Sequence, residues 1–293
     1  MSKVRRGGWS WGPVEGVSLR ALSLGGGVQS TALALMTCHG VVGPRPDVMI
    51  FSDPGDEASL TMRHLDWLEA EVTRQTNGQM RCIRTSKGER LSDSIRRRAR
   101  GRNGVRKDGE PNRFVSAPFF TANGGQGRRQ CTREFKVEPI TKVQRELLGF
   151  KPRQRIPPRS CEIWIGFSTD EVVRAGPSFE RWTVHRFPLL EERMSRWDCE
   201  QWLRRHGYPV PPKSACVFCP YRSNAEWRWL KEHDPEAWNE AVEIDRLIRN
   251  TPGMKHAEYV HRSCVPLDEV DLSTAEDRGQ GNMLEICEGG CGL

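Results

Sequence analysis

Two segments of the chain hold the residues whose types and spacing can do chemistry. Cys216 and Cys219 form a Cys-x-x-Cys pair, and Cys131 lies 85 residues earlier in the chain. A Cys-x-x-Cys pair brings two thiolates within reach of one metal centre, and a distant third cysteine can complete the ligand set. Arg133 and Lys136 follow Cys131, and cations at such positions stabilise a thiolate or hold a phosphate. This combination suggests sulfur chemistry on a nucleotide or nucleic acid.

The composition limits the classes of protein to which the chain can belong. It has 293 residues, ten of them cysteine, which is enough for one large domain or for one domain with an appendage. No run approaches the roughly 18 apolar residues that a membrane helix needs, and the N-terminus lacks the apolar stretch of a signal peptide. We therefore expect a cytoplasmic protein that does not associate with membranes. Disulfides are rare in that compartment, so metal ligation or catalysis is the leading explanation for the thiols.

Positive charge is concentrated in residues 84–113. The formal net charge of the chain is +7, and this segment holds Arg84, Lys87, Arg90, Arg96, Arg97, Arg98, Arg100, Arg102, Arg106, Lys107 and Arg113. Such a run is either a solvated surface or a contact for the phosphate backbone of RNA or DNA, and the sequence leaves both readings open. Residues 99–130 have weak periodicity and are rich in Gly and Arg, which predicts a lid or substrate loop.

Strand and helix patterns alternate along the chain. Apolar runs predict strands over 17–24, 47–51, 81–85, 161–167 and 183–189. Helical spacing and capping residues predict helices over 30–36, 58–74, 133–148, 195–206, 224–232 and 235–250. This alternation predicts an α/β fold whose open, mostly parallel sheet carries helices on both faces.

A run of three glycines, Gly25-Gly26-Gly27, follows the first predicted strand. An open α/β sheet places its phosphate site at such a turn, where glycines let the backbone approach the ligand. The N–H groups at the helix start, with the hydroxyls of Ser23, Ser30 and Thr31, can donate hydrogen bonds to phosphate oxygens. The sequence matches neither G-x-x-x-x-G-K-[ST] nor G-x-G-x-x-G, and a plain tight turn is the alternative.

The stretch Ser23-Leu24-Gly25-Gly26-Gly27-Val28-Gln29-Ser30 resembles the PP-loop of the adenine nucleotide alpha-hydrolase group, whose usual form is Ser-Gly-Gly-x-Asp-Ser. Gln29 stands where the ATP-cleaving members carry aspartate. The stretch Phe51-Ser52-Asp53-Pro54-Gly55-Asp56-Glu57 resembles the strand-end Asp-Thr-Gly segment of the same group. This resemblance implies that Asp53 or Asp56 meets a ribose hydroxyl or Mg²⁺.

Two later stretches extend the match. Cys131 to Ile140 resembles the Cys-x-x-x-Arg-Lys-Val-x-Pro-Leu segment of sulfonucleotide reductases, and Gly166 to Arg174 resembles a Gly-x-x-x-x-Glu-x-x-Arg segment that follows a strand. The resemblance implies that Arg133 and Lys136 face nucleotide phosphates and that Asp170 and Arg174 lie in the same site. Together the matches cover about residues 17–235 and resemble the phosphoadenosine phosphosulfate (PAPS) reductase-like family.

That resemblance also suggests a division of the chain and a metal centre. Residues 1–190 would form the nucleotide-binding α/β domain, and 191–293 a mainly helical or irregular part with the Cys-x-x-Cys metal site. Iron–sulfur members of the family use a Cys-Cys pair followed by Cys-x-x-Cys, but here Gln130 replaces one cysteine. The fourth ligand of a [4Fe–4S] cluster is then Cys287, or else Cys161, Cys264 or Cys291, or one iron is open. Zinc is the alternative metal, with His206, His233 and His261 as further ligands.

The C-terminal residues 287–293 loosely resemble the Glu-Cys-Gly catalytic tail of the reductases, which makes Cys291 a second candidate catalytic thiol beside Cys131. A frayed terminus is the alternative.

The resemblance implies an enzyme that binds ATP or a related adenine nucleotide with Mg²⁺. It would adenylate a nucleic-acid or nucleotide acceptor and then transfer sulfur to it, using the iron–sulfur cluster and a sulfur donor protein. One alternative is a thiol-dependent sulfonucleotide reductase. The other is a non-catalytic subunit that binds a nucleotide or nucleic acid and contains structural zinc.

Overall fold

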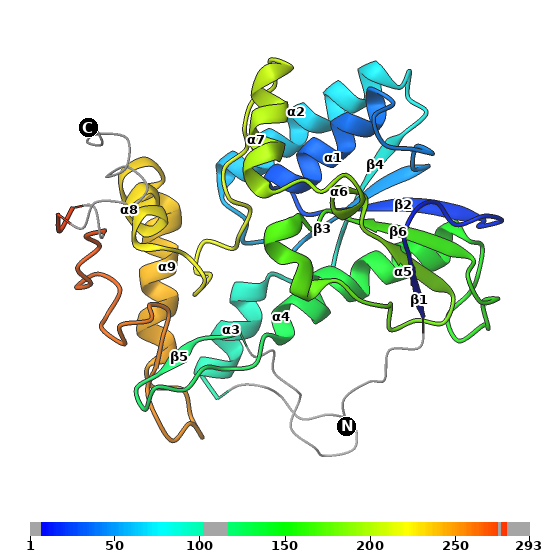
Figure 1. Cartoon of the computed structure of the whole chain (residues 1–293). Coiled ribbons are helices and arrows are strands. Elements are labelled where there is room, and N and C mark those ends of the chain that lie inside the picture. The colour runs from blue at the N-terminus through cyan, green and yellow to red at the C-terminus, as the bar shows by residue number, and fades with distance from the viewer. Residues whose placement is uncertain (1–6, 102–116, 275–276, 280–293) are drawn as a thin grey trace, which may run out of the picture. The chain divides into compact units, whose positions relative to one another are not determined.

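The computed structural model describes residues 7–101, 117–274 and 277–279 (Figure 1). Contacts group the chain into two compact units. Unit 1 comprises Met1–Leu91 with Cys131–Ala215, and unit 2 comprises Ser92–Gln130 with Cys216–Leu293. The division predicted at residue 190 stays a prediction, because compactness alone does not define a part that folds by itself.

Unit 1 is built on an open, six-stranded sheet in which all neighbouring strands are parallel. The strands, in sheet order, are β1 (Gly8–Ser10), β7 (Thr183–Arg186), β6 (Cys161–Ile165), β2 (Leu19–Leu24), β3 (Val48–Asp53) and β4 (Arg81–Ser86). The predicted α/β class and parallel sheet are confirmed. A Rossmann-like sheet of this kind is consistent with the α/β folds that bind nucleotides.

Helices cover both faces of this sheet (Figure 1). One face carries α1 (Val28–Cys38), α2 (Ser59–Gln75) and α7 (Arg196–Arg205), and the other carries α5 (Glu138–Leu147). The period of two along β2 explains how one strand serves both layers. Leu22 and Leu24 pack with the first set of helices, and Leu19 and Ala21 pack on the side of α5. Buried parallel strands read as the continuous apolar runs seen in the sequence.

Short helical segments surround the strand ends of unit 1. They are α4 (Gln130–Thr132), the π-helical turn η1 (Arg133–Val137), the 3-10 helix η2 (Thr169–Arg174) and α6 (Pro188–Glu191). The strand predicted over 183–189 ends at Arg186, because Pro188 has no N–H for the ladder and begins α6 instead.

Unit 2 is mainly helical. Its elements are α3 (Leu91–Ala99), α8 (Asn224–His233), α9 (Pro235–Ile248) and the antiparallel pair β5 (Phe120–Thr121) and β8 (Glu258–Tyr259). Ser223 and Glu226 form a capping box at the start of α8, and Asp234 caps α9 with Pro235 in its first turn. Among the described residues, no helix is both long and apolar enough to cross a membrane.

Candidate functional site

The candidate site lies where the strand order of unit 1 reverses. From β2 the chain first moves to β3 and β4 on one side, and it later returns to β6 on the other side of β2. In open α/β sheets, ligands bind at the carboxyl ends of the strands at such a switch point. The glycine run follows β2 at this edge, and Gly166 follows β6 at the same edge.

The glycine run forms the predicted turn into a helix. Gly26 has φ +75°, and a Cβ there would lie 3.4 Å from the Thr61 methyl group, so this position favours glycine. Gly27 is the N-cap of α1, and the described residues supply neither a side-chain cap bond nor an acidic residue in the first turn. The N–H groups at this helix start therefore suit an anion. The hydroxyl of Ser30 donates to the carbonyl of Gly27 at 3.1 Å.

The loop after β6 lies directly against this helix start. A Cβ on Gly166 would lie 3.2 Å from the backbone nitrogen of Ser30, so this close approach favours glycine. The side-chain amide of Gln29 is 3.5 Å from the Ser168 hydroxyl and 3.4 Å from Oε2 of Glu171. The structure thus brings the glycine turn and the segment 166–171 together, although they are far apart in the sequence.

Asp170, a predicted nucleotide ligand, is engaged in local hydrogen bonds. Its carboxylate accepts from the Arg196 N–H at 2.5 Å and from the Ser168 hydroxyl at 3.0 Å. These bonds, with that from Arg196 the stronger cause, hold the pKa of Asp170 below its usual range. Asp170 therefore ties η2 to the start of α7, which is a structural role.

Arg174, the other predicted ligand after β6, lies across an aromatic ring. Its guanidinium carbon is 4.4 Å from the centre of the Phe167 ring, and its Nη1 forms an ion pair with Glu171. The side chain is 45% exposed, so its charge is accessible at the edge of the site. Glu171, which is the glutamate of the motif that follows β6, links Arg174 to Gln29.

Two other predicted ligands are buried against internal partners. The Thr31 hydroxyl is fully buried and shares a 3.0 Å hydrogen bond with Nε2 of His64. Burial lowers the pKa of His64 to about 4, so its ring is neutral at pH 7. The Asp56 carboxylate is also buried and pairs with Arg90 at 2.8 Å. Thr31 and Asp56 are therefore each held by a partner within the chain, and their role as ligands stays a prediction.

Asp53 keeps the position that a ligand needs. It ends β3 at the carboxyl edge of the sheet, is half-buried, and accepts a hydrogen bond from the Gly55 N–H at 2.7 Å. Gly55 has φ +82° and fits closely against Arg90, which fixes this turn. A carboxylate held in this way suits a ribose hydroxyl or Mg²⁺.

Lys136 reaches a buried carboxylate beside the glycine turn. Its Nζ is 2.7 Å from Oε1 of Glu57, whose side chain is fully buried, and the Ser214 hydroxyl donates to the other oxygen at 3.1 Å. Ser214 in turn lies near Gly27, with its Cβ 3.9 Å from where a Cβ would stand there. Neither Glu57 nor Ser214 was among the ligands predicted from the sequence.

The helical segment that follows Cys131 contains the π-helical turn η1, and Pro139 removes one backbone hydrogen bond that a helix would have there. Proline has no N–H, so the carbonyl of Phe135 loses its usual helical partner. The hydroxyl of Ser52, in β3, donates to that carbonyl at 2.6 Å instead.

Arg133 is the first residue of the π turn, and its carbonyl accepts a hydrogen bond from the Glu138 N–H. Its side chain is about half exposed and pairs with Glu138 at 3.1 Å. Such π turns occur often at functional sites.

The Cys-x-x-Cys pair forms a tight turn in unit 2. The Cys219 N–H donates to the Cys216 carbonyl at 2.9 Å, and the buried Arg222 donates to the same carbonyl at 3.2 Å. Both cysteines are half-buried. The turn supplies two thiols, but no group of three His, Cys, Asp or Glu side chains is arranged to hold a metal within the described ranges. These residues therefore do not by themselves fit a cluster or a zinc ion.

The remaining cysteines differ in their surroundings. Cys131 is half-buried in unit 1, whereas Cys287 and Cys291 lie outside the described residues. Cys161 is fully buried in the core beside α5, and burial raises the pKa of its thiol, so it does not suit the role of fourth ligand. The Cys264 thiol contacts the Thr121 carbonyl at 3.5 Å, and partial burial also raises its pKa.

The three histidines considered for zinc have other neighbours. The ring of His206 stacks on Trp202, that of His233 stacks on Trp229, and that of His261 hydrogen-bonds with Ser263 and Asn224.

Most described cations of the basic segment are paired within the chain. Arg84 pairs with Asp66 and Glu69, and Lys87 with Glu134, in unit 1. In unit 2, Arg98 is buried against Glu258, and Arg96 pairs with Glu240 and Glu243 of α9. The sequence therefore overstates the charge that is open to a partner. Arg102, Arg106, Lys107 and Arg113 lie outside the described residues.

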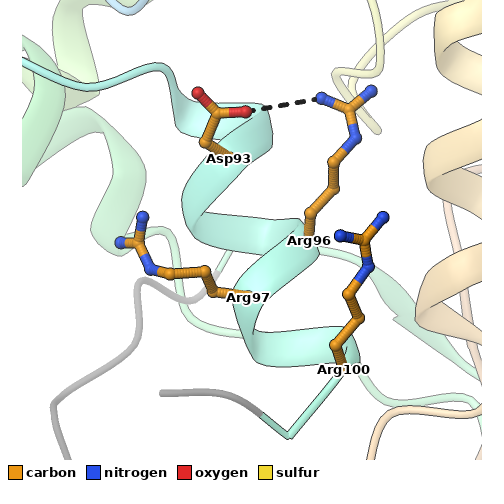
Figure 2. A pocket seen from close by; sticks show the side chains of 4 residues that line it. All are labelled: Asp93, Arg96, Arg97 and Arg100. Carbon is orange, nitrogen blue, oxygen red and sulfur yellow. Dashed lines mark ion pairs between the residues drawn. The ribbon is translucent and has the colours of Figure 1, made fainter. Parts of the chain in front are cut away.

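One face of α3 lines a hollow of about 310 Å³ in unit 2 (Figure 2). Asp93, Arg96, Arg97 and Arg100 line it, and their spacing of three and four residues places them on one side of the helix. Figure 2 shows the ion pair between Asp93 and Arg96 and the two exposed arginines, Arg97 in α3 and Arg100 directly after the helix ends.

No protein-family model matches the chain, and no curated protein matches it significantly.

Proposed function

We propose that the chain is an adenine-nucleotide-binding enzyme of the PAPS reductase-like branch of PP-loop proteins. One observation carries the proposal. The uncapped start of α1 and the loop after β6 meet at the switch point of a parallel sheet, where Gln29 reaches Ser168 and Glu171. Backbone N–H groups at this place suit a nucleotide phosphate. The motifs quoted from the sequence support the family.

The proposed reaction begins with adenylation of the acceptor. A carbonyl oxygen of the acceptor attacks the α-phosphorus of ATP, a bond to this oxygen forms, and the bond to pyrophosphate breaks. The glycine turn holds the phosphates, and Arg133, Lys136 and Arg174 neutralise developing charge. Asp53 would hold Mg²⁺, which would supply positive charge to stabilise the phosphates during the transfer.

In the second step, a donor protein supplies sulfur at the oxidation level of hydrosulfide, and this sulfur attacks the activated carbon. The carbon–sulfur bond forms, the sulfur loses its proton, and AMP leaves with the former carbonyl oxygen. Cys131, beside Arg133, is the proposed catalytic thiol of unit 1, and Cys291 of the tail is the second. A [4Fe–4S] cluster or zinc on Cys131, Cys216, Cys219 and Cys287 stays a separate proposal, and no step is derived through it.

The proposed acceptor is a nucleic acid or nucleotide. Arg97 and Arg100 support a polymer, because their exposed side chains line the hollow on α3 and can meet backbone phosphates. Among the described residues of 84–113, the proposed contact with RNA or DNA is therefore assigned to the surface around Arg97 and Arg100.

A second candidate function is thiol-dependent reduction of a sulfonucleotide. Gln29 favours it, because a neutral amide engaged with Ser168 and Glu171 replaces the carboxylate of the ATP-cleaving members. Here a thiolate attacks the sulfur of an adenylylated sulfate, the nucleotide leaves, and a second thiol releases sulfite as a disulfide forms.

The discriminating experiment uses the full chain purified without oxygen. Iron and zinc content are measured, and release of pyrophosphate from ATP is assayed with and without RNA or DNA. Pyrophosphate release that a polymer stimulates supports the proposal. Sulfite from a sulfonucleotide without pyrophosphate supports the second function. Binding of a polymer with neither product would instead indicate a non-catalytic subunit. Replacement of Cys216 by Ser should lower metal content if the cysteine turn binds metal, with Cys38→Ser as the control.

A further inference from the structure

A row of aromatic side chains follows the carboxyl edge of the sheet in unit 1. Trp11 comes directly after β1, Phe187 directly after β7, and Phe167 two residues after β6. Gly25 comes directly after β2 and begins the glycine turn. Because these four strands are parallel, their ends share one edge of the sheet, and the row leads toward the candidate nucleotide site.

The rings of this row are in contact. The centroids of Trp11 and Trp9 are 5.2 Å apart, and Trp9 meets Phe187 edge-on at 6.2 Å. Phe187 stacks on Phe167 at 5.7 Å with an interplanar angle of 9°. Arg174 then covers the Phe167 ring at 4.4 Å. The contacts are therefore continuous from the edge strand to a cation of the site, with the fully buried Phe187 supporting the rings on either side of it.

The far end of the row joins the glycine turn through side chains. Arg174 pairs with Glu171, and Glu171 accepts from Gln29 in the first turn of α1. A molecule lying along the row would thus reach the place where the nucleotide phosphates are proposed to bind. The row is therefore continuous with the proposed nucleotide site, which supports a functional role for this surface.

The near end of the row is exposed but held in place. Trp11 is 60% exposed and Trp9 is 45% exposed, which is unusual for the largest side chains of the chain. The Gly12 N–H, next to Trp11, donates to Oε1 of Glu191 at 2.9 Å, and Glu191 is fixed by the buried Arg186. Two indole rings are therefore presented to solvent on a fixed backbone.

We propose that the exposed Trp11, Trp9 and Arg174, with the half-buried Phe167, form the surface on which a single-stranded nucleic acid approaches the site, and that the buried Phe187 packs between Trp9 and Phe167. Unpaired bases stack on Trp9 and Trp11, and Arg174 meets a backbone phosphate near the activated nucleotide. The inference deepens the proposed function and rests on it for the chemistry, because it names the acceptor as a base in an unpaired strand.

Aromatic and cationic chemistry favours this occupant over a protein. Single-stranded nucleic acids bind to surfaces that combine exposed aromatic rings with positive charge, because every base has a face that can stack. The row supplies the rings and Arg174 the cation, on a chain with net charge +7. In a duplex the bases already stack on one another, so the row should discriminate against it.

The test measures binding of fluorescently labelled 15-nucleotide RNA and DNA strands to the full chain by anisotropy, with the matching duplex alongside. Trp11→Ala is the main variant, Trp11→Phe the conservative one, and Trp197→Ala the control, because Trp197 is 65% exposed on α7 outside the row. Trp11→Ala should weaken single-strand binding roughly five- to hundredfold, whereas Trp11→Phe should retain most of it. Thermal melting of each variant confirms that it is folded.

The outcomes separate this inference from the proposed function, because ATP binding is measured on the same proteins. Loss of single-strand binding in Trp11→Ala with unchanged ATP binding supports both. Single-strand binding through Trp11 by a protein that binds no adenine nucleotide supports the surface and contradicts the proposed function. The inference is overturned if wild type and Trp11→Ala bind single strands equally, or if Trp197→Ala loses as much affinity as Trp11→Ala. It is also overturned if the duplex binds as tightly as the single strand, or if no strand binds at all.

Discussion

The side-chain amide of Gln29 lies 3.4 Å from Oε2 of Glu171, and this contact joins the first turn of α1 to the segment after β6. The two residues are on opposite sides of the switch point in the parallel sheet of unit 1. The glycine turn and the loop after β6 are therefore held together at one place on the sheet edge.

Replacing Gln29 by Ala should weaken nucleotide binding more than it weakens folding. The change removes donors to Ser168 and Glu171 from a half-buried position, and such hydrogen bonds each contribute about 0.5–1.5 kcal/mol. We expect ATP affinity to fall roughly three- to tenfold by calorimetry, with a small change in melting temperature. Gln75→Ala is the control, because the Gln75 amide bonds Tyr208 at the end of α2. Equal losses of affinity in both variants would contradict a local role for Gln29.

The pair of Lys136 and Glu57 should behave as one unit in unfolding experiments. Lys136→Met leaves the buried Glu57 carboxylate without this cation, which should cost roughly 2–4 kcal/mol of unfolding free energy. Adding Glu57→Gln should recover part of this loss, because the amide can still accept from Ser214. Urea denaturation of both single variants and the double variant gives the coupling energy. Strictly additive losses would show that the two side chains do not stabilise one another.

Stability should fall on acidification partly because His64 must take up a proton. Its folded pKa, about 4, is below the usual value of 6.5, so the unfolded chain binds more protons between these values. The contribution of His64 is present above pH 6.5 and is lost as the pH falls through that window to about 4. We expect His64 to account for roughly 1–2 kcal/mol of the loss between pH 7 and pH 4.5. Urea denaturation at both pH values should give a smaller difference for His64→Gln, which can keep a hydrogen bond to Thr31. An unchanged difference would show that His64 does not titrate as described.

The exposed arginines of α3 should contribute a salt-dependent part of nucleic-acid binding. Arg97→Gln with Arg100→Gln should lower the slope of log affinity against log salt by about 2, because each phosphate contact contributes about 0.9. Arg63→Gln with Arg204→Gln removes the same charge from exposed positions on α2 and α7 and serves as the control. If the control lowers the slope equally, net charge rather than the hollow on α3 explains the binding.

The sheet and most helices could be predicted because their patterns are local. Strands such as β2 and β3 are continuous apolar runs, and α8 and α9 begin at residues that cap helices. The helix α3 escaped prediction because its charged face dominates the sequence, although Leu91 and Ile95 are buried one turn apart. The short edge strand β1 has three residues and no apolar alternation.

The predicted site was less complete than the predicted fold. Motif positions located Gly26, Gln29 and Lys136, but they did not reveal that Thr31 and Asp56 face buried partners. Partners such as Glu171 and Ser214 depend on contacts between distant segments, which no local spacing encodes. The aromatic row was hidden for the same reason, since its members follow different strands.

The most direct measurement is equilibrium binding of ATP by calorimetry to the wild-type chain, Gly26→Ala and Gly40→Ala. Both glycines have positive φ, +75° and +71°, so alanine strains the backbone at either position. Only Gly26 belongs to the glycine turn, whereas a Cβ at Gly40 would meet open space after α1. We predict that wild type and Gly40→Ala bind ATP, and that Gly26→Ala loses at least roughly tenfold in affinity while remaining folded. Unchanged binding by Gly26→Ala, or no adenine-nucleotide binding by the wild-type chain, would contradict the account.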